Sequence, residues 1–291
     1  MSDPINFEIE ELVARYELHP HRQDVFVEGE PDRGLIRVFL QLHGHPDTAV
    51  FSISTVNVPA HRLIARQLLH PSRRSEVIVL AMELEEQRVS PSQVACIADA
   101  DFEYLLPSGI KCSLLLFTDY ASMELYAFSE DAINKVLIIV APKTSLAGAA
   151  LLGMLAGPLQ LLFSAAAVNF DLQLGLAWIE HIDKFFAAQH GNVLFDEAEF
   201  MKRYLIDRLP TERVEQFKTR LAEIQSLLSS DIRCRIRGHD FIRIFTWFLR
   251  TVEKCKRLNE DSVRQMLYVA ITPGELLAQP TFSSLQKRLT R

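Results

Sequence analysis

Two short apolar runs, each followed by an acidic residue, determine the fold: Val94-Ala-Cys-Ile-Ala-Asp-Ala-Asp101 and Asp24-Val-Phe-Val-Glu-Gly29. Runs of this length and composition, followed by turn residues, are typical of buried strands. Two further runs, Ala49–Val56 and Ser113–Thr118, have the same character. Stretches with helical spacing precede or separate the four runs, at 7–16, 32–42, 61–69 and 75–87. This alternation predicts an α/β fold with a largely parallel sheet.

Carboxylates follow the predicted strands at the edge where a parallel sheet binds its ligands. Glu28 ends the first run, and Asp99 and Asp101 end the third. Asp119 follows the last run, with Glu124 five residues further on. Carboxylates gathered at one edge repel one another unless a cation neutralises them, and oxygen ligands without His or Cys suit Mg²⁺ or Mn²⁺. The pattern therefore predicts a divalent-metal site of the kind that hydrolyses phosphodiesters.

The pair Asp99 and Asp101 needs a geometric argument. On an extended strand, residues two apart point the same way, so both carboxylates would reach one metal cluster. Taken alone, D-x-D is an ordinary turn signal, and Glu-Gly after a strand is also common. The occurrence of both motifs after strands, in this order, is what favours a site.

The two acidic motifs resemble those of a TOPRIM domain, which is shared by topoisomerases, primases and OLD-type nucleases. The resemblance is carried by Val25-Phe-Val-Glu-Gly-Glu-Pro-Asp32 and Ile97-Ala-Asp-Ala-Asp-Phe102. It implies a TOPRIM-like Rossmannoid core in which Glu28 acts in acid/base chemistry or binds metal. It likewise implies that Asp99 and Asp101 bind Mg²⁺ or Mn²⁺.

Two more segments are similar to an uncharacterised TOPRIM family that often sits beside ABC-type ATPases. They are Phe117-Thr-Asp-Tyr-Ala-Ser-Met-Glu-Leu-Tyr126 and Arg237-Gly-His-Asp-Phe241. That family includes the effector nuclease of PARIS-type phage-defence systems, in which an ATPase partner holds or releases the effector. The resemblance implies a toxic Mg²⁺-dependent endonuclease that cleaves RNA, such as tRNA, or DNA, with an ABC-type ATPase as partner. It also makes Glu124 a further acid of the site and Lys143 a candidate for its lysine.

Other roles for these residues stay open. Glu30, Asp32 and Asp119 lie beside the motifs and are candidates for further ligands. The competing interpretation is a catalytically degenerate scaffold that binds and regulates the ATPase, with the apolar stretch 144–170 as a docking face. A gain in thermal stability on adding Mg²⁺ or Mn²⁺ separates the two interpretations, because only an intact site gains stability by binding the ion.

The composition of the chain changes after Lys143, because the 27 residues 144–170 carry no charge. That length could span a membrane, but internal glycines, Pro158 and the lack of flanking aromatic or basic clusters favour a buried helix pair, with no membrane partner. We predict an N-terminal extension over 1–20, a TOPRIM-like catalytic domain over 21–142 and an α-helical C-terminal domain over 143–291. Helices are expected there at 172–189, 196–209, 212–228, 239–258 and 261–268.

Charge is divided unevenly, since residues 201–291 carry a net +8 and residues 1–200 a net −14. The residues of one basic cluster flank Gly238, namely Arg233, Arg235, Arg237, His239 and Arg243. This cluster is a candidate nucleic-acid-binding site through phosphate contacts, and the alternative is a helix face ion-paired to Asp231 and Asp240. The helical part would supply phosphate contacts, homodimer contacts or both. A second basic group is interpreted as a solvated helix surface, and the alternative is a contact with nucleic acid or with an acidic partner; its members are Arg62, Arg66, Arg73 and Arg74.

Composition limits the remaining classes. Hydrophobic residues make up 48% and charged residues 23% of the 291 residues, which excludes a disordered or fibrous chain. The four cysteines have no C-x-x-C spacing, so a disulfide framework or a zinc site is not expected. No secretion-signal pattern opens the chain, and a cytoplasmic location is expected. No P-loop pattern is present, so ATP binding by that route is excluded.

Overall fold

The computed structural model describes residues 6–66, 72–189 and 192–290. The chain forms two compact units. The first unit comprises residues up to Ala100, residues Gly109–Asp119 and residues from Thr272 onward, and the second comprises Asp101–Ser108 and Tyr120–Ile271. The chain therefore passes between the units four times, once directly after the predicted strand that carries Asp99.

A four-stranded sheet forms the centre of the first unit. Its strand order is β3 (Ala49–Ser52), β2 (Asp24–Val27), β5 (Val94–Ala98) and β6 (Leu115–Phe117), and every pairing is parallel. These are the four strands that the apolar runs predict, so the mixed α/β class with a parallel sheet is confirmed. All residues of the central strands β2 and β5 are buried. Strands buried on both faces have continuous apolar sequences, which is why these two stretches stand out.

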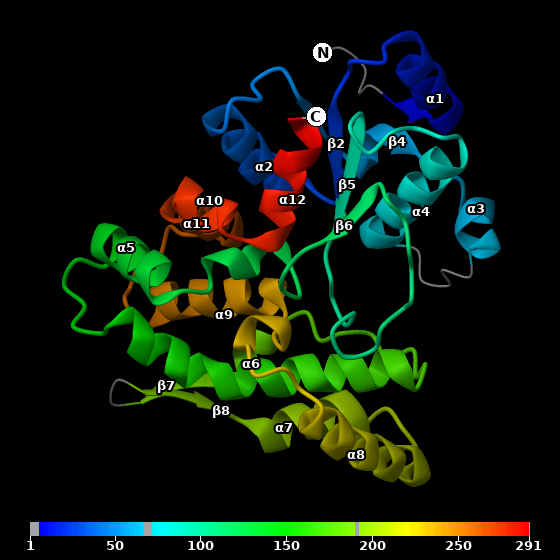
Figure 1. Cartoon of the computed structure of the whole chain (residues 1–291). Coiled ribbons are helices and arrows are strands. Elements are labelled where there is room, and N and C mark those ends of the chain that lie inside the picture. Colours follow the sequence, from blue (N-terminus) through cyan, green and yellow to red (C-terminus); the bar gives the residue numbers. More distant parts are fainter. Residues whose placement is uncertain (1–5, 67–71, 190–191, 291) are drawn as a thin grey trace. The chain divides into compact units, whose positions relative to one another are not determined.

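Helices cover both faces of this sheet (Figure 1). One face carries α2 (Glu30–Leu42) and α12 (Pro280–Leu289), and the other carries α4 (Arg73–Glu86), against which α1 (Ile9–Leu18) and α3 (Ala60–Ala65) pack. Phe39 of α2 meets Phe282 of α12 edge to face, with 4.8 Å between the ring centres. On the other face, Phe26 of β2 shares a core with Leu12 and Val77. The sheet is therefore the middle layer of a three-layer unit.

The first unit also contains a short second sheet, and one of its strands begins where a longer strand was predicted. β1 (Phe7–Glu8) pairs in parallel with β4 (Val56–Asn57), and Asn57 Nδ2 donates to both carboxylate oxygens of Glu8 at 2.9 and 3.1 Å. The strand predicted over 49–56 was too long, because the 3₁₀ turn η1 (Ile53–Thr55) divides it. Ser and Thr side chains bond to nearby backbone and compete with a strand here. Residues 67–69 of the predicted helix 61–69 lie outside the described residues.

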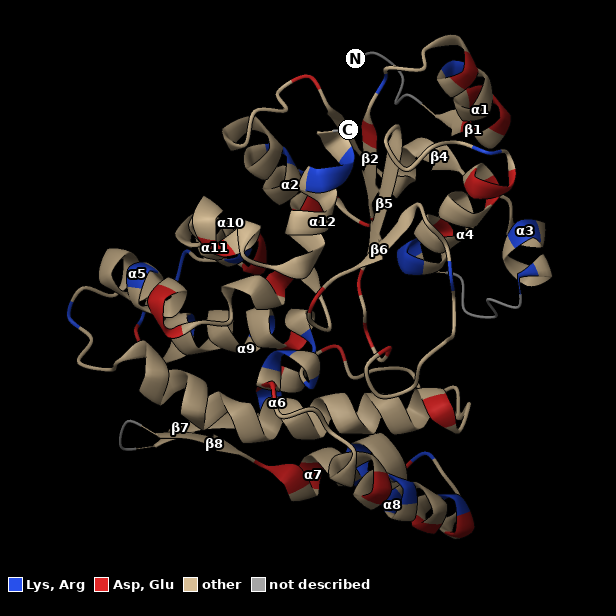
Figure 2. Cartoon of the chain, in the orientation of Figure 1, with Lys and Arg blue, Asp and Glu red and all other residues tan. Residues whose placement is uncertain are grey.

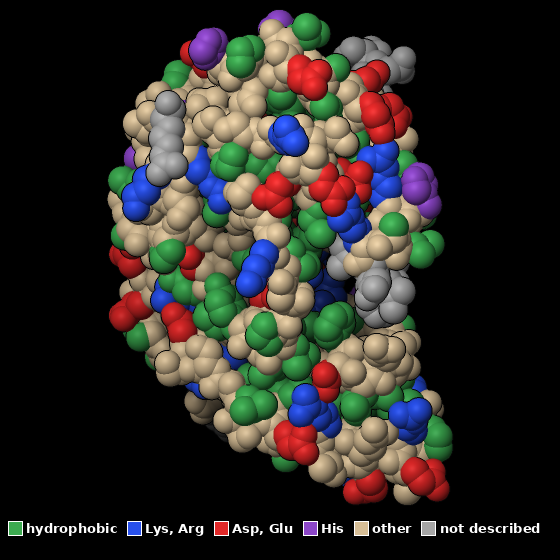
Figure 3. Space-filling model, turned by 45° about the vertical axis from the view of Figure 1, so that its right-hand side comes forward, with side chains coloured by type: hydrophobic (Ala, Val, Ile, Leu, Met, Phe, Trp, Pro, Cys, Tyr) green, Lys and Arg blue, Asp and Glu red, His purple; other side chains and the backbone are tan. Residues whose placement is uncertain are grey.

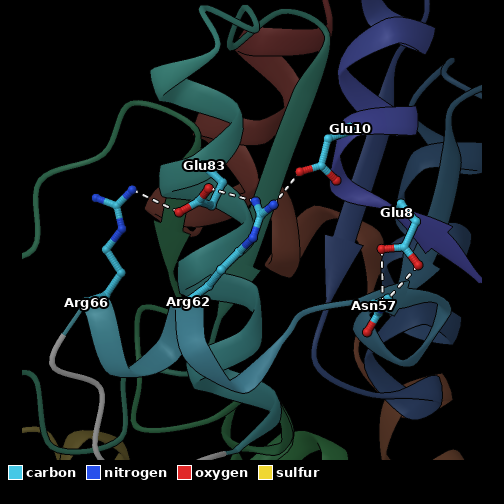
Figure 4. Close-up of polar contacts among 6 residues, drawn as sticks. All are labelled: Glu8, Glu10, Asn57, Arg62, Arg66 and Glu83. Atoms are coloured by element: carbon cyan, nitrogen blue, oxygen red, sulfur yellow. Dashed lines mark hydrogen bonds and ion pairs between the residues drawn. The ribbon is translucent and has the colours of Figure 1, made fainter.

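Ion pairs join α3 to its neighbours (Figure 4). Arg62 pairs with Glu83 of α4 at 2.8 Å and also with Glu10 of α1, and Arg66 pairs with the same Glu83 at 3.0 Å. Arg73 pairs with Glu76 at 2.9 Å. Three members of the second basic group therefore bind acidic side chains of this unit, as expected for a solvated helix surface.

The second unit consists mainly of helices. In chain order its elements are η2 (Met123–Ala127), α5 (Glu130–Val140), α6 (Gly148–Asp171), η3 (Ile182–Phe185), β7 (Phe186–Gln189), β8 (Asn192–Phe195), α7 (Glu197–Met201), η4 (Lys202–Ile206), α8 (Thr211–Ser226), η5 (Ile232–Cys234), α9 (Gly238–Thr251) and α10 (Glu260–Ala270). The short helix α11 (Pro273–Leu277) follows in the first unit. The helices predicted over 212–228 and 261–268 are confirmed, and the one predicted over 239–258 ends earlier, at Thr251.

The uncharged stretch forms one helix, so the predicted helix pair was wrong. α6 runs through Pro158 without a break, and Figure 2 shows it free of charged residues until its end. Leu155 and Leu159, on either side of the proline, are fully buried, and this packing offsets the backbone hydrogen bond that proline cannot make. Length and composition would also allow α6 to cross a membrane, but 56% of its most apolar segment is buried inside the protein.

The helix predicted over 172–189 was also wrong. That segment instead contains η3 and the first strand of the antiparallel hairpin β7–β8. Phe186 and Phe195 face each other across the hairpin, with 4.9 Å between their ring centres. Aromatic pairing between strands stabilises a hairpin, and helical spacing along one segment does not reveal it.

Candidate functional site

Glu28 and Asp99 come together at the carboxyl ends of two adjacent strands. β2 ends at Val27 and β5 at Ala98, and the parallel register pairs Val27 with Ile97. The segments that follow the two strands therefore leave the sheet side by side. Glu28 Oε1 accepts a hydrogen bond of 2.7 Å from the backbone N of Asp99. Both residues are half-buried. This confirms that two of the predicted carboxylate residues meet at the predicted edge of the sheet.

The turn after β5 is held by the neighbouring strand. Thr118 N donates to the carbonyl of Ala98 at 3.0 Å, and Thr118 Oγ1 accepts from Ala100 N at 2.9 Å. Thr118 and Ala100 are fully buried. These bonds fix the backbone on both sides of Asp99 and so hold this residue beside Glu28.

Arg74 also lies at these strand ends, although the sequence pattern assigned it to a solvated surface. Its Nε donates to the carbonyl of Asp99 at 2.8 Å, and its guanidinium carbon lies 5.3 Å from the centre of the Phe117 ring. The packing of α4 on β5 brings this arginine to the backbone of Asp99. No motif marks it, because an arginine in the first turn of a helix looks like any other surface cation.

Glu30 and Asp32 lie in the first turn of α2 and make polar contacts there. Asp32 Oδ2 accepts from Gly29 N at 3.1 Å, and Glu30 pairs with Arg33 at 2.8 Å on an exposed surface. Acidic residues in the first turn satisfy free backbone N–H groups and interact favourably with the helix dipole. Both residues lie beside Glu28 in the chain, and the contacts seen are those of a helix cap.

Asp101 does not extend β5. The strand ends at Ala98, and Asp101 lies in a turn with φ of +48°, a left-handed conformation that Asp tolerates. Its backbone N donates to the carbonyl of Ala121 at 2.7 Å, within the second unit. The alternation argument for Asp99 and Asp101 was therefore wrong, because the extended backbone on which it depends stops before both residues.

Asp119 binds the start of α12. Its two carboxylate oxygens accept from the backbone N of Thr281 at 3.1 and 3.2 Å, and Thr281 Oγ1 donates to the carbonyl of Phe117 at 2.7 Å. A carboxylate that receives the first N–H groups of a helix acts as its cap. The role seen for Asp119 is therefore to dock α12 against β6.

Glu124 lies in the second unit, where it is 3% exposed and paired with cations. His239 Nδ1 is 2.9 Å from Glu124 Oε1, and Arg264 Nε is 3.4 Å from the same oxygen. Burial raises the pKa of Glu124, but the hydrogen bond and charge of His239 and the charge of Arg264 outweigh it and lower that pKa below its usual value. The bond and the charge of Glu124 in turn raise the pKa of His239, whose side chain is 70% exposed.

Gly238 makes this pairing sterically feasible. A Cβ at Gly238 would lie 2.1 Å from Ser122 Oγ and 2.6 Å from Glu124 Oε2, both too close for any real contact. The next residue but one, Asp240, is buried and accepts from Trp178 Nε1 at 3.2 Å. The Gly-His-Asp segment and the segment that carries Glu124 therefore form one packed arrangement, although they lie more than a hundred residues apart in the chain.

The predicted nucleic-acid-binding cluster is largely engaged with the second unit itself. Arg237 lies over the Trp178 ring with its guanidinium carbon 4.6 Å from the ring centre, and it pairs with Asp240 at 3.4 Å. Arg243 pairs with Glu260 at 3.0 Å. Arg235 is half-buried, and its Nε has no hydrogen-bond partner among the described residues.

Arg233 and Lys143 complete the predicted cations. Arg233 lies 3.9 Å above the Tyr120 ring and pairs with Asp231 at 2.7 Å. Lys143 is exposed between α5 and α6. The alternative interpretation of ion pairs to Asp231 and Asp240 thus describes Arg233 and Arg237.

The carboxylates at the sheet edge fit a hard divalent ion. Within residues 6–66, 72–189 and 192–290, no three His, Cys, Asp or Glu side chains are close enough to form a complete metal-binding group. Mg²⁺, however, ordinarily binds through one or two carboxylates and keeps water or phosphate oxygens as its other ligands. Glu28 and Asp99 supply carboxylates of this kind.

Comparison of the sequence with models of known protein families finds no match, and comparison with curated protein sequences finds none either. The resemblance to TOPRIM proteins therefore rests on the short motifs quoted above.

Proposed function

We propose that this protein is a Mg²⁺- or Mn²⁺-dependent endonuclease whose site lies at the carboxyl ends of β2 and β5. The observation that carries the proposal is the meeting of Glu28 and Asp99 across two adjacent parallel strands, joined by a 2.7 Å hydrogen bond. In parallel sheets, ligands bind at this edge. The TOPRIM-like motifs at these two positions add to the argument.

Glu28 and Asp99 would hold the ion, with Asp101 as the third ligand that the resemblance implies. A bound divalent ion polarises a phosphodiester and lowers the pKa of a water molecule. Arg74, which bonds to the carbonyl of Asp99, presents a cation that suits a substrate phosphate. In the reaction, water gives up a proton as its oxygen bonds to phosphorus, the bond from phosphorus to one ester oxygen breaks, and that ester oxygen takes up a proton.

The biological setting that we propose follows from the motif resemblance alone. The protein would be the toxic effector of a phage-defence system in the cytoplasm, controlled by an ABC-type ATPase and acting on RNA, such as tRNA, or on DNA. Its helical unit would contact the substrate, a second copy of the chain, or both.

A catalytically degenerate scaffold that binds and regulates the ATPase is the second candidate. The pairing of Glu124 favours it, because this expected site acid binds His239 and Arg264. Under this proposal, Glu28 and Asp99 would only stabilise the sheet edge.

An in-cell experiment separates the candidates. Wild type and Glu28→Gln are expressed with and without an ATPase partner, under phage challenge, and all RNA and DNA ends are sequenced. Glutamine keeps an oxygen for the bond from Asp99 N, so folding should be retained. We expect new ends in the wild type and a reduction of about 10²- to 10⁴-fold in Glu28→Gln.

The matched control is Asp47→Asn. Asp47 is an exposed carboxylate just before β3, at the opposite edge of the sheet, and its substitution should leave the new ends unchanged. New ends that persist in Glu28→Gln would refute the site assignment. The absence of new ends in the wild type under every condition would favour the scaffold.

A further inference from the structure

A surface groove of the second unit joins cations, an aromatic ring and acidic side chains. Its volume is about 1020 Å³, at the upper end of the range for ligand sites. One wall is α9, and the others are the segments around Glu180 and Asn259. All of its lining residues belong to the second unit, so the groove does not include Glu28 or Asp99.

The α9 wall carries a stripe of three functional side chains. Arg243, Trp247 and Arg250 are spaced by four and three residues, which places them on one face of the helix. Trp247 packs on Phe186 with 5.8 Å between ring centres and stays half-buried. The indole is therefore supported from the protein side and available to the groove.

Two cations in the groove have no partner within the described part of the chain. Arg243 is bound by Glu260 and by the carbonyl of Glu180, whereas Arg250 and Lys256 are exposed and make no side-chain ion pair or hydrogen bond to a described residue. Arg250 lies in the last turn of α9, where the helix dipole favours a cation.

The opposite wall has hydrogen-bond acceptors. Glu180 is exposed and Asp183 half-buried, and both line the groove. A ligand that presents anionic groups to both walls of the groove would be repelled by them. A nucleotide instead carries an anionic phosphate for Arg250 and Lys256, a flat base for Trp247, and amino groups for carboxylates to accept.

We infer that this groove binds an unpaired segment of nucleic acid, with phosphates on Arg250 and Lys256 and a base stacked on Trp247. The base must be unpaired, because a base inside a duplex has no free face. The inference rests on the proposed function only for the choice of nucleic acid as ligand. Figure 3 shows Lys and Arg side chains interspersed with Asp and Glu on the face drawn, so no broad basic face in that view competes with the groove.

Fluorescence anisotropy with labelled single-stranded and duplex 12-mers tests the inference in EDTA, with every protein in the Glu28→Gln background so that no cleavage occurs. Arg250→Ala/Lys256→Ala removes two phosphate contacts. The salt-dependence slope for single strands should then fall by about 1.4, which corresponds to about 25-fold weaker binding at 0.1 M salt. Trp247→Leu should weaken binding about 5- to 100-fold with an unchanged slope.

The matched control is Arg213→Ala/Lys218→Ala, which removes two cations from exposed positions of α8 in the same unit. It should bind like the parent. Far-UV circular dichroism verifies folding, and the Arg250 and Lys256 variant carries the test if Trp247→Leu fails to fold. Equal binding by parent and groove variants, equal binding of duplex, or equal displacement by polyglutamate would overturn the inference. Failure of the proposed function would appear separately, as wild type that binds single strands in the groove but never generates new ends.

Discussion

Gly238→Ala is the substitution whose outcome depends most directly on the described geometry. Helix propensity alone favours alanine over glycine, by up to about 1 kcal/mol in a helix interior. The structure predicts the opposite sign, because the added methyl group would lie 2.1 Å from Ser122 Oγ and 2.6 Å from Glu124 Oε2. Overpacking of a well-filled site costs about 1–3 kcal/mol, and here the shift also disturbs the contact of Glu124 with His239. We expect the free energy of unfolding to fall by about 2–3 kcal/mol.

Urea denaturation followed by far-UV circular dichroism measures this change. Gly153→Ala is the matched control, because Gly153 lies inside α6 and, apart from its chain neighbours and the nearby backbone of α6, no atom lies within 4 Å of an added Cβ. It should raise the free energy of unfolding by up to about 1 kcal/mol. A Gly238→Ala variant at least as stable as the wild type would refute the reasoning.

A double substitution tests the cause. Ser122 Oγ is buried and has no hydrogen-bond partner among the described residues, so Ser122→Ala alone should change stability little. Added to Gly238→Ala, it removes the nearest clash and should recover part of the loss, while the contact with Glu124 remains. Full additivity of the two substitutions would contradict a direct clash between these positions.

Three other outcomes are expected. Because the hydrogen bond and charge of Glu124 raise the pKa of His239, their pairing contributes fully below the ordinary His pKa of 6.5 and is lost as pH rises through the raised pKa. Urea unfolding from pH 6 to 9 should show this fall in the wild type but not in His239→Asn; equal profiles would contradict it. Asp119→Ala should lower the free energy of unfolding by about 1 kcal/mol through loss of the α12 cap, and an unchanged urea midpoint would argue against that role. Mn²⁺ should raise the thermal midpoint of the wild type but not of Glu28→Gln, and equal shifts would place the ion elsewhere.

The sheet could be predicted from sequence because β2 and β5 are buried on both faces and have uninterrupted apolar sequences. Segments whose structure depends on distant partners are harder to predict from sequence. Phe186 and Phe195 form a hairpin where helical spacing predicted a helix, since cross-strand contacts leave no local period. Proline is a usual helix breaker, so Pro158 favours two helices over the one that forms. Only the burial of the residues around Pro158 shows why α6 continues through it.

Some residues of the candidate site could likewise be placed from the sequence, and others could not. Strand ends placed Glu28 and Asp99 correctly at one edge of the sheet, because parallel register fixes which ends meet. The conformation of Asp101 depends on a turn, which alternation along a strand cannot describe. The partner of Glu124 and the position of Arg74 depend on helix packing, for which the sequence contains no short-range signal.

The return of α12 to the first unit affects the order of events during translation. The strands that carry Glu28 and Asp99 are made early, but the helix N-terminus that Asp119 caps does not exist until Thr281 has been synthesised. The ribosome produces the whole second unit in the interval, while Phe39 still lacks the ring of Phe282. A nascent chain therefore cannot finish packing the unit that carries the carboxylate pair until α12 emerges.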